Sequence, residues 1–161
     1  MHDLLPLLGP TRTASVAAVS ASASARSVGR WLATGRLVQL HPGWVTTPEF
    51  AEDWTVRAYA ATGYVRGPLS HMSALAVHGV VDNRVTRLDV TVAGERRLRS
   101  SRWLRVHRSR IPTAVVRVRG LPATTLARSL IDTWGDAHRA RAMRASTRSP
   151  GPPASGPPVS D

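Results

Sequence analysis

The chain has 161 residues and a net charge of +12, with 22 arginines, no lysine and ten acidic residues. Its length allows one domain or two very small ones. The absence of cysteine excludes a disulfide framework and a thiolate metal site, and the positive charge favours polyanionic partners through counterion release and steering.

The N-terminal residues predict two short helices. Residues 2–8 can form the first, which would pack leucines against the segment that follows, and Thr13 can cap a second helix over residues 14–20. Asp3 stands where a signal peptide would carry a basic residue, and prolines interrupt the apolar run. No apolar run approaches the length of about 20 residues that spans a bilayer. We therefore expect a cytoplasmic protein that does not enter membranes.

A third helix is predicted over residues 25–34. Ser24 can cap its N-terminus, and Gly35 stands where a left-handed residue would end it. Val28 and Leu32 fall on one side of this helix, which predicts a buried back.

The front of the same helix is basic, and a β-hairpin is predicted after it. Arg26 and Arg30 lie one turn apart, as in a recognition helix that reaches base edges or phosphates. The β-prone runs 37–40 and 44–47 flank a Pro-Gly turn, which predicts the wing of a winged helix-turn-helix. The predicted interface with duplex DNA consists of Arg26, Ser27, Arg30, Thr34, Arg36, Gln39 and His41. The competing interpretation is an ordinary solvated helix face.

Two more helices are predicted in the middle of the chain, over residues 49–62 and 71–78. Acidic residues favour the start of the first helix, and Gly63 would end it. The Ser70-His71-x-Ser73 run is expected to cap the second helix and to satisfy buried backbone groups.

From residue 88 the hydrophobic period changes to two. This predicts three strands of an antiparallel sheet, at residues 88–92, 103–108 and 115–120. Residues 84–119 carry a net charge of +9, so we predict a basic sheet face that contacts phosphates without reading sequence. Its residues are Arg96, Arg97, Arg99, Arg102, Arg105, Arg117 and Arg119. A merely solvated face, or one that meets an acidic protein surface, remains open.

A last helix is predicted over residues 124–134. Thr124 or Thr125 would cap it, and Asp132 would pair with Arg128 one turn earlier. The residues predicted to face the core are Leu126, Leu130 and Ile131.

The segment after Arg144 is rich in Pro, Gly and Ser and contains no aromatic residue, so it predicts disorder. The predicted fold class is thus α+β with three parts. A winged helix-turn-helix occupies residues 1–48, a helix plus antiparallel-sheet module occupies residues 49–144, and a disordered tail occupies residues 145–161.

The sequence offers little for metal binding or catalysis. His71 and His78 lie two turns apart on one predicted helix, and no carboxylate is spaced to complete a metal site with them. A nuclease needs clustered carboxylates to hold its metal ion, whereas those of this chain are scattered. We expect no enzymatic activity, no metal and no cofactor.

Five segments carry a resemblance to a known family. In order they are GRWLATGRLVQLHPGWV, LSHMSALAVHGV, LDVTV, WLRVHRSRIP and VRGLPATTLARSLIDTWGDAHRA. From about Arg12 to Arg144 the chain resembles actinobacterial proteins with an AbiEi-type (type IV toxin–antitoxin) antitoxin N-terminal domain. The family usually has a glycine in the turn before the recognition helix, where this chain has Ala21-Ser22-Ala23.

The resemblance implies a winged helix and a DNA-binding, self-regulating antitoxin or related regulator, with a toxin encoded nearby as a functional partner. Many longer relatives continue into an endonuclease-like domain, and this chain is expected to be truncated before it. The alternative hypothesis is a non-catalytic remnant or interaction module of a nuclease-fusion protein. The oligomeric state is left open by the sequence.

Overall fold

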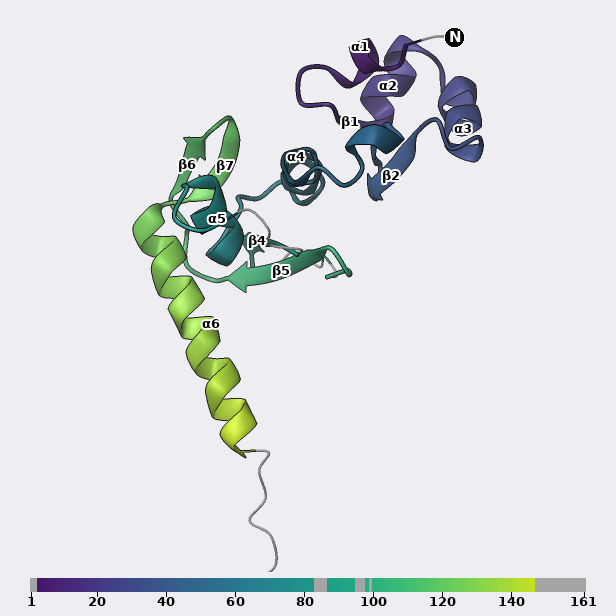
Figure 1. The fold of residues 1–161 in the computed structure, drawn as a ribbon. Helices are drawn as coiled ribbons and strands as arrows, with labels where there is room; N and C mark the ends of the chain where they lie inside the picture. The colour runs from purple at the N-terminus through teal and green to yellow at the C-terminus, as the bar shows by residue number, and fades with distance from the viewer. Residues whose placement is uncertain (1–2, 83–86, 95–97, 99, 147–161) are drawn as a thin grey trace, which may run out of the picture.

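The computed structural model describes residues 3–82, 87–94, 98 and 100–146, and these residues form an α+β fold (Figure 1). An N-terminal unit combines short helices with a small sheet, and a central sheet is followed by a long C-terminal helix. Helix α4 (Trp54–Val65) lies between the two parts and contacts strands of both. The tail predicted over residues 145–161 overlaps the end of the last helix, and residues 147–161 lie outside the described residues.

The N-terminal unit alternates helices and strands. Its elements are α1 (Leu5–Leu8), β1 (Ala14–Ser15), α2 (Val16–Ser22), α3 (Ala25–Ala33), β2 (Val38–His41) and β3 (Trp44–Thr46). The strands form an antiparallel sheet in the order β1-β3-β2. The predicted hairpin is confirmed, since β2 and β3 pair across a turn in which Gly43 has a φ of +75°.

Helix α2 begins later than predicted because another serine caps it. Ser15 accepts a hydrogen bond from the Ala18 amide at 3.1 Å. The Thr13 hydroxyl instead donates to the carbonyl of Val45 at 2.9 Å, so the predicted Thr13 cap is wrong. The residues predicted to start this helix form β1, which pairs with β3.

Helix α3 matches its prediction closely. Ser24 accepts a hydrogen bond from the Ser27 amide at 3.2 Å, and Gly35 follows the helix with a φ of +70°. Ser24 itself has a φ of +128°, a conformation that favours glycine, so the tight turn between α2 and α3 is strained at this residue. The buried cluster beneath α3 consists of Leu4, Leu8, Val19, Val28, Trp31, Leu37 and Val45.

Helix α4 differs from its prediction at both ends. A 3-10 turn (Pro48–Phe50) precedes it, and Asp53 caps it by accepting a hydrogen bond from the Val56 amide at 2.9 Å. Gly63 does not end the helix but lies inside it, where a Cβ atom would collide with the ring of Trp44. Glycine at this position therefore permits the close approach of α4 to β3.

The predicted three-stranded antiparallel sheet is wrong. Strand β4 (Leu88–Ala93) pairs with β5 (Leu104–Ser109) in parallel, whereas β6 (Val115–Val118) and β7 (Leu121–Thr124) form a separate antiparallel hairpin. Leu69 bridges β4 and β7, through Val90 and Ala123, which gives the order β5-β4-Leu69-β7-β6. A period of two predicts a strand but not its direction or its neighbour.

The core of this central part consists of Ala58, Ala61, Val65, Leu69, Ala74, Val77, Leu88, Val90, Val92, Leu104, Val106, Leu121 and Ala123. Helices α4 and α5 (His71–Val77) contribute to it beside the strands. Both helices contact β4, and α5 also contacts α6. The short helix α5 therefore connects the sheet to the C-terminal helix.

Helix α6 (Leu126–Ser146) extends well beyond its prediction and projects away from the sheet (Figure 1). The predicted pair is confirmed, with Arg128 Nε 2.8 Å from Asp132 Oδ1. The predicted core-facing residues are wrong, because Leu126, Leu130 and Ile131 are exposed. None of the helices in the described part of the chain is long and apolar enough to cross a membrane.

Candidate functional site

The exposed side of α3 and its C-cap carry three of the seven residues predicted to contact DNA. Arg26, Arg30 and Thr34 are exposed, whereas Val28 and Trp31 on the other side are buried. The Thr34 hydroxyl donates to the carbonyl of Arg30 at 2.9 Å, so it is engaged within the helix. The two arginines are thus the principal groups that this surface offers to a ligand.

The remaining predicted DNA contacts are more dispersed. Gln39 is exposed on β2, whereas Ser27 and Arg36 are partly buried. His41 is only 5% exposed and stacks on Tyr64 of α4, with ring centroids 5.7 Å apart. His41 therefore lies in the junction with α4 and not on the exposed side of α3.

Burial is the main cause of a lowered pKa at His41, and the nearby charge of Arg57 lowers the pKa further. A buried imidazole is favoured in its neutral form because its charged form loses hydration. This electrostatic setting agrees with a packing role for His41.

The predicted basic sheet face is divided between two regions. Arg102 and Arg105 belong to the β5 side of the sheet, whereas Arg117 and Arg119 belong to the β6–β7 hairpin at the other edge. Arg102 lies over the ring of Trp103, 4.7 Å from its centroid. Three further residues of the predicted face lie outside the described residues: Arg96, Arg97 and Arg99. The described arginines of the predicted basic face therefore lie at opposite edges of the sheet.

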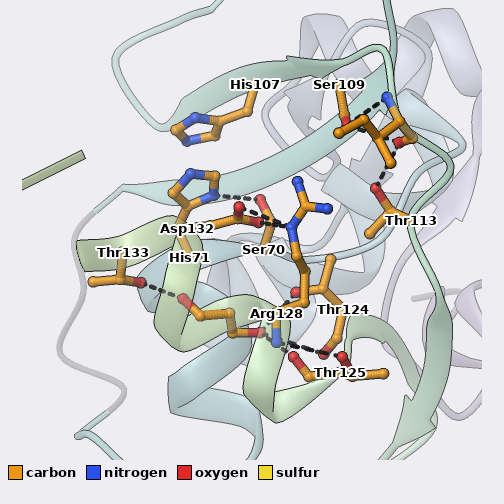
Figure 2. A network of polar contacts seen from close by, with 12 residues as sticks. Ser70, His71, His107, Ser109, Thr113, Thr124, Thr125, Arg128, Asp132 and Thr133 are labelled. Carbon is orange, nitrogen blue, oxygen red and sulfur yellow. Dashed lines mark hydrogen bonds and ion pairs between the residues drawn. The ribbon is translucent and has the colours of Figure 1, made fainter. Parts of the chain in front are cut away.

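A buried polar cluster, which the sequence did not predict, lies where α5, β5 and α6 meet. The rings of His71 and His107 are stacked, with centroids 3.6 Å apart and planes inclined by 16° (Figure 2). His71 Nδ1 is 3.0 Å from Ser70 Oγ, and His107 Nε2 is 2.7 Å from Asp89 Oδ1. We call this set, completed by Asp136, the two-histidine cluster.

Asp136 of α6 closes the two-histidine cluster. Its Oδ2 lies 3.6 Å from His71 Nε2, 3.8 Å from His107 Nδ1 and 3.3 Å from an Arg105 nitrogen. Its Oδ1 accepts a hydrogen bond from Arg139 at 2.6 Å. His71, His107 and Asp136 each offer a ligand atom, and these atoms lie within 4.8 Å of one another, so the three side chains could hold a metal ion.

The pKa values in the cluster favour neutral His71 beside ionised Asp136. Burial lowers the pKa of His71, and His107 lowers it further, against the opposing effect of the nearby carboxylates. Burial alone would raise the pKa of Asp136, but Arg139, His71, Arg105 and His107 together outweigh it and lower that pKa. Burial and the neighbouring ring thus oppose protonation of His71, whereas the surrounding groups favour the ionised form of Asp136.

The backbone that carries His71 is unusual. His71 has a φ of +50° at the first position of α5, a left-handed conformation that is costly for most side chains. Ser70 precedes the helix without a side-chain capping bond, so its predicted capping role is wrong. The prediction that this run satisfies buried backbone groups is confirmed at Ser73, whose hydroxyl accepts a hydrogen bond from the buried Asp89 amide at 2.8 Å.

Sequence reasoning missed the two-histidine cluster because its members are far apart along the chain. Along the sequence, the candidate partner of His71 in a metal site was His78 on the same helix. In the structure His78 Nε2 instead lies 2.9 Å from the carbonyl of Thr124. The feature of the sequence that pointed to this region was the Ser70-His71-x-Ser73 run.

Comparison with known proteins does not place the chain in a family. No protein-family model matches the chain, and no curated protein matches it. The assignment of function therefore depends on the residues and on the resemblance to AbiEi-type antitoxin domains.

Proposed function

We propose that the N-terminal unit is a winged helix-turn-helix that binds duplex DNA, and that the protein is a cytoplasmic, non-enzymatic regulator similar to type IV antitoxins. In this proposal α2 and α3 are the two helices of the motif, α3 enters the major groove, and the β2–β3 hairpin is the wing. The observation that carries the proposal is the two-sided character of α3. Its back is buried through Val28 and Trp31, and its front exposes Arg26 and Arg30.

The chemistry of arginine explains why this surface suits DNA. A guanidinium group can donate two parallel hydrogen bonds to the O6 and N7 atoms of guanine, which contributes about 1–3 kcal/mol of discrimination against other bases. Residues spaced like Arg26 and Arg30 lie on the same helical face, so both can point into one groove. The chain's net charge of +12 adds attraction to phosphates that is independent of sequence.

Gln39 and Arg36 are proposed to assist α3 from the wing side. Gln39 is exposed on β2, where a wing would pass along the DNA backbone or the neighbouring groove. Arg117 and Arg119, on the distant hairpin, are proposed as phosphate contacts only. The antitoxin part of the proposal, with a toxin encoded nearby, rests on the family resemblance alone.

Fluorescence anisotropy with the full chain tests the proposal. Two labelled duplexes are compared over a range of salt concentrations: the region upstream of the protein's own gene, and a scrambled duplex of equal composition. Arg30→Ala should cost about 1–3 kcal/mol on the upstream duplex and much less on the scrambled one. Arg117→Ala is the matched control, which should weaken both duplexes alike and flatten the salt dependence.

Each outcome of this titration has a meaning. Equal losses on both duplexes for Arg30→Ala would reduce α3 to a backbone contact, and equal affinity of the native chain for both duplexes would contradict sequence-specific regulation. Absence of binding to either duplex would favour the alternative, a non-catalytic remnant or interaction module of a nuclease-fusion protein.

A further inference from the structure

The two-histidine cluster brings three hydrogen-bond acceptors to one point. In neutral histidine one ring nitrogen donates and the other accepts. His107 Nε2 is held by the carboxylate of Asp89 at 2.7 Å, so its proton belongs on that nitrogen and Nδ1 carries the lone pair. His71 Nδ1 faces Ser70 Oγ at 3.0 Å, which leaves Nε2 as the acceptor when the ring donates to this hydroxyl.

The two free nitrogens face the same carboxylate oxygen. His71 Nε2 and His107 Nδ1 lie 3.6 and 3.8 Å from Asp136 Oδ2. Two lone pairs and an anionic oxygen repel one another at this separation unless a positive charge lies between them. A cation held among the three atoms would remove this repulsion.

We propose that the two-histidine cluster is a binding site for a divalent transition-metal ion of the Zn²⁺ class. The ligands are His71 Nε2, His107 Nδ1 and Asp136 Oδ2, and the remaining coordination positions are open to water. Two imidazoles and one carboxylate form an established ligand set for such ions. This inference is independent of DNA binding.

The two nitrogen–oxygen separations are close to those of such a site, and movement of the two rings would complete it. Zinc binds imidazole nitrogen and carboxylate oxygen at about 2.0–2.2 Å, which places tetrahedral ligand atoms roughly 3.4 Å apart. The separations of Asp136 Oδ2 from His71 Nε2 and His107 Nδ1, 3.6 and 3.8 Å, need to shrink by only a few tenths of an ångström. The three ligand atoms as a set lie within 4.8 Å of one another, so the two ring nitrogens must also approach each other. The rings must also tilt out of their stack, because the in-plane lone pairs of two parallel rings do not meet at one point. Torsions about the Cβ–Cγ bonds allow this tilt, since their energy wells are broad.

The outer partners are those that a metal site requires. Histidine ligands usually donate their second ring nitrogen to a carboxylate or another polar group, which fixes the tautomer and orients the ring. Asp89 performs this role for His107 and Ser70 performs it for His71. The Asp89 amide is in turn held by Ser73 at 2.8 Å. The left-handed φ of His71, +50°, is also explained, because strain of this kind persists where function requires a particular side-chain placement.

Arg139 and Arg105 are cationic neighbours of the site. Arg139 bonds to Asp136 Oδ1, the oxygen that faces away from the proposed ion. Arg105 lies 3.3 Å from Oδ2, and its side chain is 51% exposed, so it can turn into solvent when an ion binds. Because the guanidinium is about half exposed, water screens this ion pair, and its loss opposes the metal only weakly.

A bound ion would join three separate elements of the fold. His71 begins α5, His107 is on β5 and Asp136 is on α6, so the ion would tie the long C-terminal helix to the central sheet. A ligand that binds only the folded state of a protein raises its melting temperature, and the increase grows with the ligand concentration. Zinc should therefore stabilise the protein and protect α6 in particular.

The test uses the full chain after treatment with a chelator. Zn²⁺ is titrated calorimetrically at neutral pH, and Co²⁺ is added separately as a spectroscopic probe of coordination geometry. We expect one ion per chain, an increase in melting temperature, and visible Co²⁺ absorption of a four- or five-coordinate nitrogen and oxygen site. Asp136→Asn and His107→Ala should abolish these signals, and Asp89→Asn should weaken binding by about 10–100-fold.

His138→Ala is the matched control, because His138 is exposed on the same helix two residues beyond Asp136. It should bind Zn²⁺ like the native chain. Circular dichroism of each metal-free variant establishes that it is folded, and Asp136→Asn preserves shape if His107→Ala does not fold. The proposal is overturned if the native chain binds no Zn²⁺, or if a folded Asp136→Asn variant binds it as tightly as the native chain.

Discussion

Helices α3 and α6 both begin at a hydroxyl side chain, Ser24 for α3 and Thr125 for α6, whose Oγ1 accepts a hydrogen bond from the Arg128 amide at 3.4 Å. They nevertheless attach to the protein in opposite ways. Helix α3 buries its apolar side, with Val28 and Trp31 in the N-terminal core. Helix α6 exposes Ile131 and Trp134, at 69% and 77%, whereas Ser129 on the same helix is buried. Attachment through apolar area and attachment through polar contacts therefore occur in the same chain.

The difference lies in what each helix meets. Helix α3 closes over a small core to which other short helices contribute leucine and valine, so burial of apolar area drives its packing. Helix α6 meets α5, whose residues include His71, and its neighbour β5 contributes His107 and Arg105. The surface that α6 meets is therefore polar, and buried polar groups need hydrogen-bond partners. For this reason α6 turns polar side chains toward it, and the apolar pattern of the helix does not determine its orientation.

Removal of Trp31 should produce the largest loss of stability. Trp31 is 7% exposed and lies in the N-terminal core, so Trp31→Ala should lower the free energy of unfolding by about 3–5 kcal/mol through lost burial and an unfilled cavity. Chemical denaturation followed by far-ultraviolet circular dichroism measures it. Substitutions of surface residues typically cost less than about 1 kcal/mol. A loss that small for Trp31→Ala would show that α3 is not held by apolar packing.

Removal of the Ser129 hydroxyl should have the next largest effect and tests the polar attachment of α6. Its Oγ lies 2.7 Å from the buried Thr124 hydroxyl and donates to the Thr125 carbonyl at 2.8 Å. Ser129→Ala leaves Thr124 without this partner and should cost about 1–3 kcal/mol. Thr133→Ala is the control one turn later, where the hydroxyl only donates to its own helix. Equal small losses for both variants in thermal unfolding would contradict a polar attachment.

Loss of the α3 cap should have a smaller effect. Ser24 caps the helix but has a φ of +128°. Ser24→Ala removes the cap and retains the strained backbone, so it should cost about 0.5–2 kcal/mol. Ser24→Gly removes the cap but relieves the strain, so it should be less destabilising than Ser24→Ala. The reverse order of the two melting temperatures would show that backbone strain at this turn is negligible.

Truncation of the exposed tryptophan of α6 should have the smallest effect. Trp134 is 77% exposed, so Trp134→Ala should change the free energy of unfolding by no more than about 0.5 kcal/mol. The contrast with Trp31→Ala is the sharpest form of the comparison, because the same side chain is removed from each helix. A loss of several kcal/mol at Trp134, measured by the same denaturation, would mean that the apolar side of α6 is covered.

Much of the N-terminal unit could be predicted from sequence because its determinants are local. The cap at Ser24, the left-handed Gly35 and the hairpin around Gly43 are each specified by a few neighbouring residues, and all are present in the structure. The pairing of Arg128 with Asp132 follows equally from helical spacing. The assignment of the DNA-contacting side chains remains a prediction, apart from the observed burial of His41.

The sequence by itself therefore determined where most helices and strands form, since periodicity and capping act over one or two turns. The tertiary structure alone decided how they pair and which side they bury. Strand direction depends on the path of the chain: β4 and β5 pair in parallel, and Leu69 lies between β4 and β7, so β5 and β6 are at opposite edges and the strands do not form one antiparallel sheet. The two-histidine cluster likewise exists only because α5, β5 and α6 converge, and no local pattern in sequence encodes a contact between elements so far apart.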